Sequence, residues 1–210
     1  MPPPYCYDYP RPAVTVDLVA FTLAGGGLRT LFIRRKHDPF SGRWAIPGGF
    51  LEIDEPIEKA ARRELREETG LDYRGPISPI GVFGEPGRDP RGRTISMAYA
   101  AAIPGPVPGV TGGDDASEAS WLDPRGTLEL AFDHALILGT ALDWLHQAIE
   151  RGPIALEFLP EEFGLADVKV LHRAVGNPER AATAWLSRTK RAGRIIPVHG
   201  AKSRYRRADR

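Results

Sequence analysis

The chain has 210 residues, with 28 Lys or Arg, 27 Asp or Glu and a formal net charge of +1. This length allows one large or two small domains, and the ordinary proportions of charged, apolar and aromatic residues indicate a globular rather than a disordered chain. The single cysteine, Cys6, excludes an intramolecular disulfide, and we interpret it as a small apolar residue near the N-terminus. Because the sequence contains neither a secretion signal nor an apolar run of membrane-spanning length, we expect a soluble, cytoplasmic protein.

Charge is distributed unevenly along the chain. Residues 171–210 contain eleven Lys or Arg and two acids, Glu179 and Asp209, which gives this segment a net charge of +9. The remainder contains 17 basic and 25 acidic residues, a net charge of −8. This asymmetry predicts two functional units, which we place at residues 1–152 and 153–210.

The first fifty residues predict strands separated by turns. Residues 13–23 and 30–35 are rich in β-branched and apolar side chains, and the glycines between them indicate a turn. A polar loop at 36–43 follows, and residues 44–50 lead into a helical segment. Gly48 and Gly49 in that approach are typical of a backbone that needs a tight turn.

The helical segment carries three carboxylates on one face. Pro56 follows two acidic residues, which is typical of a helix start, and Gly70 marks the end of the helical periodicity. Within it Glu64, Glu67 and Glu68 stand at i, i+3 and i+4. Like charges so close repel unless a cation neutralises them, and hard oxygen ligands suit Mg2+ or Mn2+. The alternative is a solvated acidic helix paired with its neighbouring arginines.

From Gly49 to Leu71 the sequence follows the pattern G-x5-E-x7-R-E-U-x-E-E-x-G-U, where U is aliphatic. This pattern resembles the Nudix box at every fixed position. The resemblance implies an α+β or α/β fold, the Nudix α/β/α sandwich with a mixed sheet. It further implies catalytic roles for Arg63, Glu64, Glu67 and Glu68, and metal binding by the three glutamates with Gly48 and Gly49.

The segment after the box predicts a phosphate-binding loop between two strands, at 80–83 and 94–103. Arginines form forked hydrogen bonds to phosphate oxygens better than lysines do, and this loop resembles that of Nudix proteins acting on or sensing ADP-ribose. A solvated hairpin loop is the alternative. The candidate substrate-binding residues are Arg35, Phe40, Trp44, Arg88, Arg91, Arg93 and Glu118.

Several of these candidates have a simpler interpretation. Phe40 and Trp44 are suited to stacking on a base, but aromatic residues at loop ends also serve in cores. Glu118, with Asp114 and Asp115, lies where some relatives place an acid that orients water or metal, but acids before a strand are commonly just solvated. A helix is predicted from Leu130 to about residue 150, and within it we interpret His134 as a structural, hydrogen-bonded histidine.

The basic C-terminal segment predicts a winged helix-turn-helix. Helices are expected at about 166–175 and 179–191, followed by two short strands around a basic turn within 195–207. The second helix would enter the major groove and the turn would lie over the DNA backbone. The candidate DNA-binding residues are Arg180, Thr183, Arg188, Lys190, Lys202, Arg204, Arg206 and Arg207. A basic solvated tail or an RNA-binding surface is the alternative.

Together the two units resemble the Nudix-related transcriptional regulators of NAD metabolism. This resemblance implies a homodimer that binds operator DNA and responds to ADP-ribose or a related nucleotide. Many such regulators have damaged Nudix boxes, whereas this box is complete, so we expect Mg2+-dependent hydrolysis as well. The alternative is a dedicated ADP-ribose pyrophosphatase, producing AMP and ribose 5-phosphate, whose basic domain serves dimerisation.

Overall fold

The fold centres on a seven-stranded mixed sheet, seen in a computed structural model that describes residues 7–208; Cys6 lies outside this range. The strand order is β3-β2-β1-β6-β5, with β4 paired to β1 and β7 paired to β2. β1 and β6 run parallel, and the other pairs are antiparallel. The strands are β1 Ala13–Ala24, β2 Gly27–Arg35, β3 Trp44–Ala45, β4 Gly48–Phe50, β5 Ile77–Phe83, β6 Thr94–Ala102 and β7 Ala116–Leu122.

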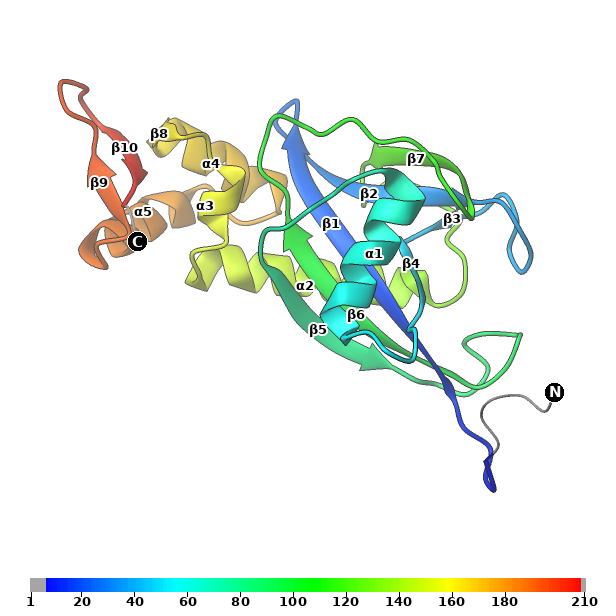
Figure 1. Ribbon diagram of the computed structural model, residues 1–210. Helices are drawn as coiled ribbons and strands as arrows, with labels where there is room; N and C mark the ends of the chain where they lie inside the picture. The colour runs from blue at the N-terminus through cyan, green and yellow to red at the C-terminus, as the bar shows by residue number, and fades with distance from the viewer. Residues whose placement is uncertain (1–6, 209–210) are drawn as a thin grey trace.

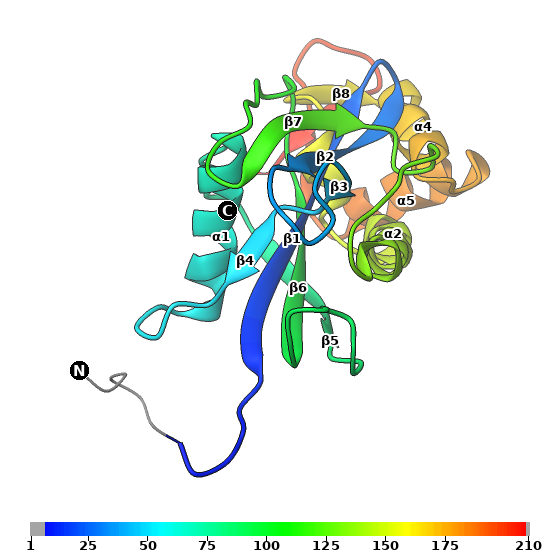
Figure 2. The same cartoon turned by 90° about the vertical axis from the view of Figure 1, so that its right-hand side faces the viewer.

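Two helices, α1 Ile57–Thr69 and α2 His134–Arg151, cover opposite faces of this sheet (Figure 2). Successive side chains of a strand point to opposite faces, so β1 contributes to two hydrophobic clusters. Leu18 and Ala20 pack with Leu65 of α1, while Val19 and Phe21 pack with the α2 side of the sheet. The predicted α/β/α sandwich with a mixed sheet is therefore confirmed.

Helix α1 begins and ends where the sequence predicts. Pro56 precedes it in an extended conformation, with φ −66° and ψ 145°, and Gly70 ends it in the left-handed region with φ 72°. The N–H of Gly70 donates to the carbonyl of Arg66, which satisfies one of the carbonyls left open at a helix end. These two residues therefore set the length of the helix that carries the three glutamates.

The C-terminal elements form a small helical unit with its own sheet (Figure 1). The sheet order is β8-β10-β9, and all pairs are antiparallel. The predicted helix, turn, helix and hairpin are confirmed, whereas strand β8 and helix α3 were not predicted. The elements are α3 Ala155–Phe158, β8 Glu162–Gly164, α4 Leu165–Ala174, α5 Arg180–Arg191, β9 Ile195–Pro197 and β10 Arg204–Arg207.

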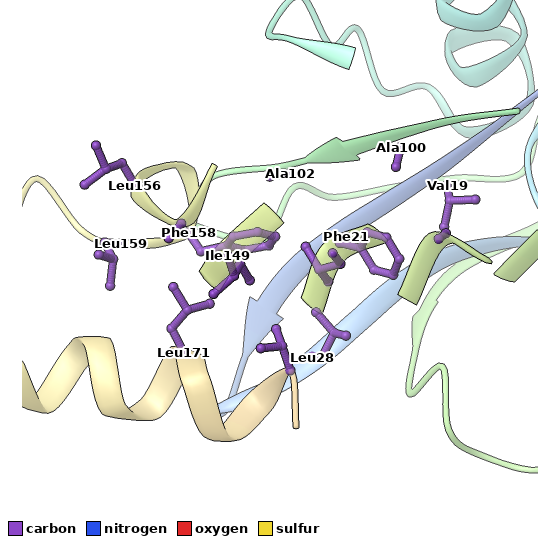
Figure 3. Close-up of a cluster of buried hydrophobic side chains, with 14 of the residues drawn as sticks. Val19, Phe21, Leu28, Ala100, Ala102, Ile149, Leu156, Phe158, Leu159 and Leu171 are labelled. Carbon is purple, nitrogen blue, oxygen red and sulfur yellow. The ribbon is translucent and has the colours of Figure 1, made fainter. Parts of the chain in front are cut away.

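The two parts of the chain share one hydrophobic cluster. Phe21 of β1, Ile149 of α2 and Leu171 of α4 all belong to it (Figure 3), and Trp185 of α5 does too. Burying a side chain of this size stabilises a fold by about 1.5–3 kcal/mol, so the shared cluster couples the stability of the two parts.

The division of the chain at residue 152 stays a prediction. Within residues 7–208, no helix combines the length and the apolar character needed to cross a membrane.

Candidate functional site

A pocket of about 320 Å³ lies where the carboxylate face of α1 meets β1, β4, the loop after β5 and the start of α2. Glu64, Glu67 and Glu68 line it together with Arg63. Arg35, Arg88 and Arg91 line the same pocket. The structure therefore brings the predicted acidic and basic groups together around one space.

Arg63 is the centre of the acidic part of the pocket. Its guanidinium donates to Glu55 at 2.6 Å, to Oε1 of Glu64 at 2.7 Å and to Oε2 of Glu67 at 3.0 Å. It also donates to the carbonyl of Phe50 at 3.0 Å. These bonds hold the pKa of Arg63 above its usual range, with the bond to Glu55 as the largest cause. Arg63 therefore orients two of the box carboxylates, as a permanently charged fork can.

Glu68 and Glu64 lie deepest in the acidic part. Burial raises the pKa of Glu68 to about 8, the nearby charges of Glu64 and Asp17 add to the rise, and a hydrogen bond from Gly48 N–H opposes it. That bond is 2.9 Å long. Burial likewise raises the pKa of Glu64, against the hydrogen bond from Arg63. Keeping both carboxylates ionised at these positions is therefore costly, and a bound cation would relieve that cost.

The two glycines before α1 are required by close approach. A Cβ at Gly49 would lie 2.4 Å from Oε1 of Glu64, and a Cβ at Gly48 would lie 2.2 Å from the carbonyl oxygen of Val16. Any side chain there would displace the Glu64 carboxylate or the β1 backbone. This explains why the sequence carries Gly-Gly at these positions, and it fits their predicted place beside the metal ligands.

The donor set fits a divalent cation such as Mg2+. Residues 7–208 contain no group of three His, Cys, Asp or Glu side chains arranged to hold a metal unaided. However, Mg2+ is commonly bound through one or two carboxylates together with water and substrate phosphates. Glu64, Glu67 and Glu68 face one pocket and supply only oxygen atoms, which is the ligand type that Mg2+ and Mn2+ prefer.

The arginines of the loop after β5 have different surroundings. Arg88 donates twice to Asp133, at 2.6 and 2.9 Å, and its side chain is only 5% exposed. Arg91 is held by Asp89 in the same forked manner, at 2.8 and 3.0 Å. Arg93 bonds to the carbonyl of Gly84 and does not line the pocket. Two of the three predicted phosphate-binding arginines thus reach the pocket, each fixed by a carboxylate.

Of the other predicted substrate residues, only Arg35 lines the pocket. Its guanidinium donates to the carbonyl of Pro39 at 2.8 Å. Phe40 packs edge-on against Phe132 with ring centres 4.9 Å apart, behind the pocket wall. Trp44 and Glu118 lie elsewhere, and both contact Arg34: the guanidinium is 4.4 Å from the Trp44 ring centre and 3.1 Å from the Glu118 carboxylate.

Several lining residues were not predicted as site residues, among them Asp17, Phe50, Asp89, Phe132 and His134. Asp114 and Asp115, which the sequence suggested beside Glu118 as acids that orient water or metal, also line the pocket. The one signal available in the sequence was a charged residue, Asp17, within an otherwise apolar strand, because an aspartate is rarely buried unless it is paired.

His134 has the hydrogen-bonded structural position that the sequence suggested. Its Nδ1 accepts the N–H of Ile46 at 2.9 Å, and its Nε2 lies 3.5 Å from Asp17. Burial lowers the pKa of His134, against the charge of Asp17, so the imidazole is neutral at neutral pH. It therefore ties the start of α2 to the floor of the pocket.

The predicted DNA-binding residues lie on α5 and on the hairpin that joins β9 to β10. Arg180, Thr183, Arg188 and Lys190 are exposed on α5, opposite a buried face containing Ala182 and Trp185. Lys202, Arg204 and Arg206 are exposed and Arg207 is half-buried.

Some of these basic groups already have partners within the protein. Arg188 donates to the carbonyl of Glu150 at 2.7 Å. Arg204 donates to the carbonyl of Glu162 at 2.6 Å, and Arg207 lies 3.3 Å from Glu157. In the described chain, neither Lys202 nor Arg206 has an ion pair or a side-chain hydrogen bond.

Comparison with known proteins agrees with this geometry. The NUDIX domain family matches residues 11–145. An ADP-ribose pyrophosphatase from Methanocaldococcus jannaschii is 40% identical over 65% of this chain and 76% of its own. The ADPR responsive transcriptional repressor NtrR from Acinetobacter baylyi is 32% identical over 80% of this chain and 68% of its own.

A solved structure extends the likeness to the whole chain. The crystal structure of a MutT/nudix family protein from Enterococcus faecalis superposes with a TM-score of 0.83 at 27% identity, covering 97% of this chain and 89% of that one. The match therefore includes the C-terminal helices and sheet as well as the sandwich. The complete box, the sandwich fold and these similarities show that the chain belongs to the Nudix family.

Proposed function

We propose that the pocket binds and hydrolyses ADP-ribose or a related nucleoside diphosphate derivative. One observation carries this proposal: the glutamates that Arg63 orients and the three arginines line the same pocket. The arginines are Arg35, Arg88 and Arg91. A volume of about 320 Å³ is within the range of small-molecule sites. The pyrophosphatase relative supports the same substrate class.

The two sides of the pocket have different roles, one in binding the diphosphate and the other in holding a cation. Arg88 and Arg91 cannot lose their charge, and their carboxylate partners fix where that charge lies, so they suit a diphosphate. On the opposite side Arg63 aims Glu64 and Glu67 into the pocket. When bound there, a divalent cation such as Mg2+ would neutralise the diphosphate and lower the pKa of a coordinated water.

This proposal is tested by AMP release from ADP-ribose with and without Mg2+. Glu67→Gln removes one carboxylate charge, and because Glu67 is the most exposed of the three box glutamates, the fold should persist. We expect turnover in the wild type that needs Mg2+ and is lost in Glu67→Gln. Turnover at the wild-type rate in that variant would exclude the role.

We further propose that the C-terminal unit binds operator DNA and that the protein is a homodimeric, cytoplasmic regulator of NAD metabolism. Support comes from the helix, turn, helix and hairpin order, from the exposed basic residues of α5 and from the free Lys202 and Arg206. The repressor relative supports a regulatory role. Under this proposal Arg188, Arg204 and Arg207 reach DNA only by exchanging their internal partners for phosphates.

Helix α2 offers a physical connection between nucleotide and DNA. Its first residue, His134, lines the pocket, and Asp133 just before it pairs with Arg88, which lines the pocket too. Its last turn contacts α5, because the carbonyl of Glu150 accepts a hydrogen bond from Arg188. A ligand that binds the two arrangements of α2 unequally would shift DNA affinity by that difference.

A second function is favoured by a specific observation. The box is complete, and Arg188, Arg204 and Arg207 are all occupied by partners within the protein. Both facts suit a dedicated ADP-ribose pyrophosphatase whose basic unit serves dimerisation. The two functions separate in a gel shift with double-stranded DNA selected by the protein from a random pool, since only the regulator enriches a sequence.

A further inference from the structure

The lining of the pocket carries more negative than positive charge. Eight carboxylates and four guanidinium groups line it, which gives a formal net charge of −4. Three of the guanidinium groups, those of Arg63, Arg88 and Arg91, are already paired with carboxylates of the protein. In the described part of the chain Arg35 forms no ion pair, and its guanidinium donates to the carbonyl of Pro39. A diphosphate without a cation would therefore enter a pocket that repels it.

Asp17 contributes one of these negative charges from outside the box helix. It is the one charged residue of β1, its side chain is 7% exposed, and it lines the pocket. Val16 and Leu18, on either side of it, are fully buried. Burying a charge costs free energy, and apolar residues of similar volume often stabilise a fold as well or better. Packing alone thus does not account for an aspartate at this position.

Groups from three other elements hold the Asp17 carboxylate in place. Ser96 of β6 donates its hydroxyl to Oδ2, and Nε2 of His134 at the start of α2 lies 3.5 Å from Oδ1. In the loop after β5, Nη2 of Arg88 lies 3.9 Å from Oδ2, while the same nitrogen donates to Asp133 at 2.6 Å. Two carboxylates therefore share one guanidinium, and this leaves an excess of negative charge beside it.

Asp17 also lies next to the glutamate side of the pocket. It pairs in register with Gly48 of β4, and the N–H of Gly48 donates to Glu68 at 2.9 Å. Burial is the main cause of the raised pKa of Glu68, and the charges of Glu64 and Asp17 add to it. A negative charge at Asp17 attracts a divalent cation to the glutamates and repels a diphosphate from Arg88. Its effects on the two ligands therefore have opposite signs.

We propose that Asp17 is a specificity-determining residue, which makes the pocket favour the nucleotide with its divalent cation over the cation-free nucleotide. This inference rests on the proposed function, because it concerns the same ligand and the same pocket. A cation bound at the glutamates offsets the excess negative charge, so that Arg88 and Arg35 attract the diphosphate. Without a cation, the charge of Asp17 adds to the repulsion. Asp17 thus distinguishes two forms of one nucleotide.

The test measures two affinities under conditions that do not require turnover. ADP-ribose is titrated by calorimetry in EDTA, and Mn2+ is titrated without nucleotide and followed by electron paramagnetic resonance. Asp17→Asn removes the charge and keeps the shape of the side chain. We expect this variant to bind ADP-ribose in EDTA about 5- to 50-fold more tightly than the wild type, and Mn2+ about 5- to 50-fold more weakly. Asp17→Ser removes the same charge with a smaller side chain and should shift both affinities in the same directions.

Two control variants separate the charge of Asp17 from its packing. Ser96→Ala removes the hydrogen bond to Asp17 and keeps the charge, so it should not reproduce the opposite shifts of the two affinities. Asp123→Asn removes one charge from the loop after β7, outside the pocket lining, where the side chain is 57% exposed. Because solvent and salt screen an exposed charge, this variant should leave both affinities unchanged.

The outcomes separate the inference from the proposed function. ADP-ribose binding in EDTA that is no tighter in Asp17→Asn and Asp17→Ser than in the wild type would overturn the inference. Weaker binding of both ligands would overturn it as well, since that pattern indicates a structural role. In either case Mg2+-dependent AMP release by the wild type would leave the proposed function standing. A wild-type protein that binds no ADP-ribose, with or without Mg2+, would refute the proposed function and with it the inference.

Discussion

Replacing Arg63 by Met should destabilise the protein more than any other single change on the exposed side of α1. The side chain is 17% exposed, and Glu55, its principal partner, is only 5% exposed. Removal of Arg63 leaves Glu55 charged and unpaired, and it brings Glu64 and Glu67 into mutual repulsion. Breaking a fully buried pair costs about 3–5 kcal/mol, and partial exposure here reduces the expected loss to about 2–3 kcal/mol.

The assay is urea and thermal unfolding, with Arg66→Met as control. Arg66 lies about one turn further along the same helix and is 57% exposed, and within residues 7–208 its one ion pair is with Glu67 at 3.6 Å. Such a surface pair is worth about 0–1 kcal/mol. For a chain of this size we expect the melting temperature to fall by about 4–12 °C in Arg63→Met and by no more than about 4 °C in Arg66→Met. Equal shifts in the two variants would refute the central position of Arg63.

Three further results are expected. Gly49→Ala should cut AMP release at least tenfold with little change in overall fold, because its Cβ would displace the Glu64 carboxylate; unaltered kinetics would count against this geometry. Charge reversal of both Lys202 and Arg206 should abolish the gel shift and leave AMP release intact, while a persisting shift would remove the hairpin from the DNA surface. Burial lowers the pKa of His172, whose ring nitrogens are both unpaired, so the contribution of the neutral imidazole to the free energy of unfolding is fully present above about pH 6.5 and decreases as the pH falls below that value. Urea midpoints of wild type and His172→Gln from pH 8 to pH 5 measure this, and identical slopes would contradict it.

The local chemistry of the site could be predicted from the sequence because it lies within one helix. A spacing of three and four residues places Glu64, Glu67 and Glu68 on one face whatever the rest of the chain does, and Pro56 and Gly70 mark the ends. The strand β8 escaped prediction for the opposite reason. Its three residues pair with β10, about forty residues away, and nothing within Glu162–Gly164 itself indicates a strand.

The remainder of the site depends on contacts between distant segments. Phe132 reaches the pocket and Asp133 reaches Arg88 because Trp44 of β3 bridges to Leu130, which anchors the segment before α2. The same anchoring delays the start of α2 to His134, although the apolar periodicity predicts a start at Leu130. Sequence proximity suggested Phe40 and Trp44 as the stacking residues, yet periodicity does not determine the direction of a loop side chain. Phe132, contributed from far along the chain, lines the pocket instead.

The most direct test of the account is whether ADP-ribose changes the DNA affinity of the 210-residue chain. Fluorescence anisotropy with a duplex selected by the protein itself would be measured in the Glu67→Gln variant, so that hydrolysis does not consume the ligand. The account predicts an apparent Kd that shifts at least fivefold between zero and saturating ADP-ribose, and a smaller shift in Asp133→Asn, where the bond to Arg88 is weakened. A Kd unaffected by saturating ADP-ribose would contradict the account, and the pocket would then serve hydrolysis alone.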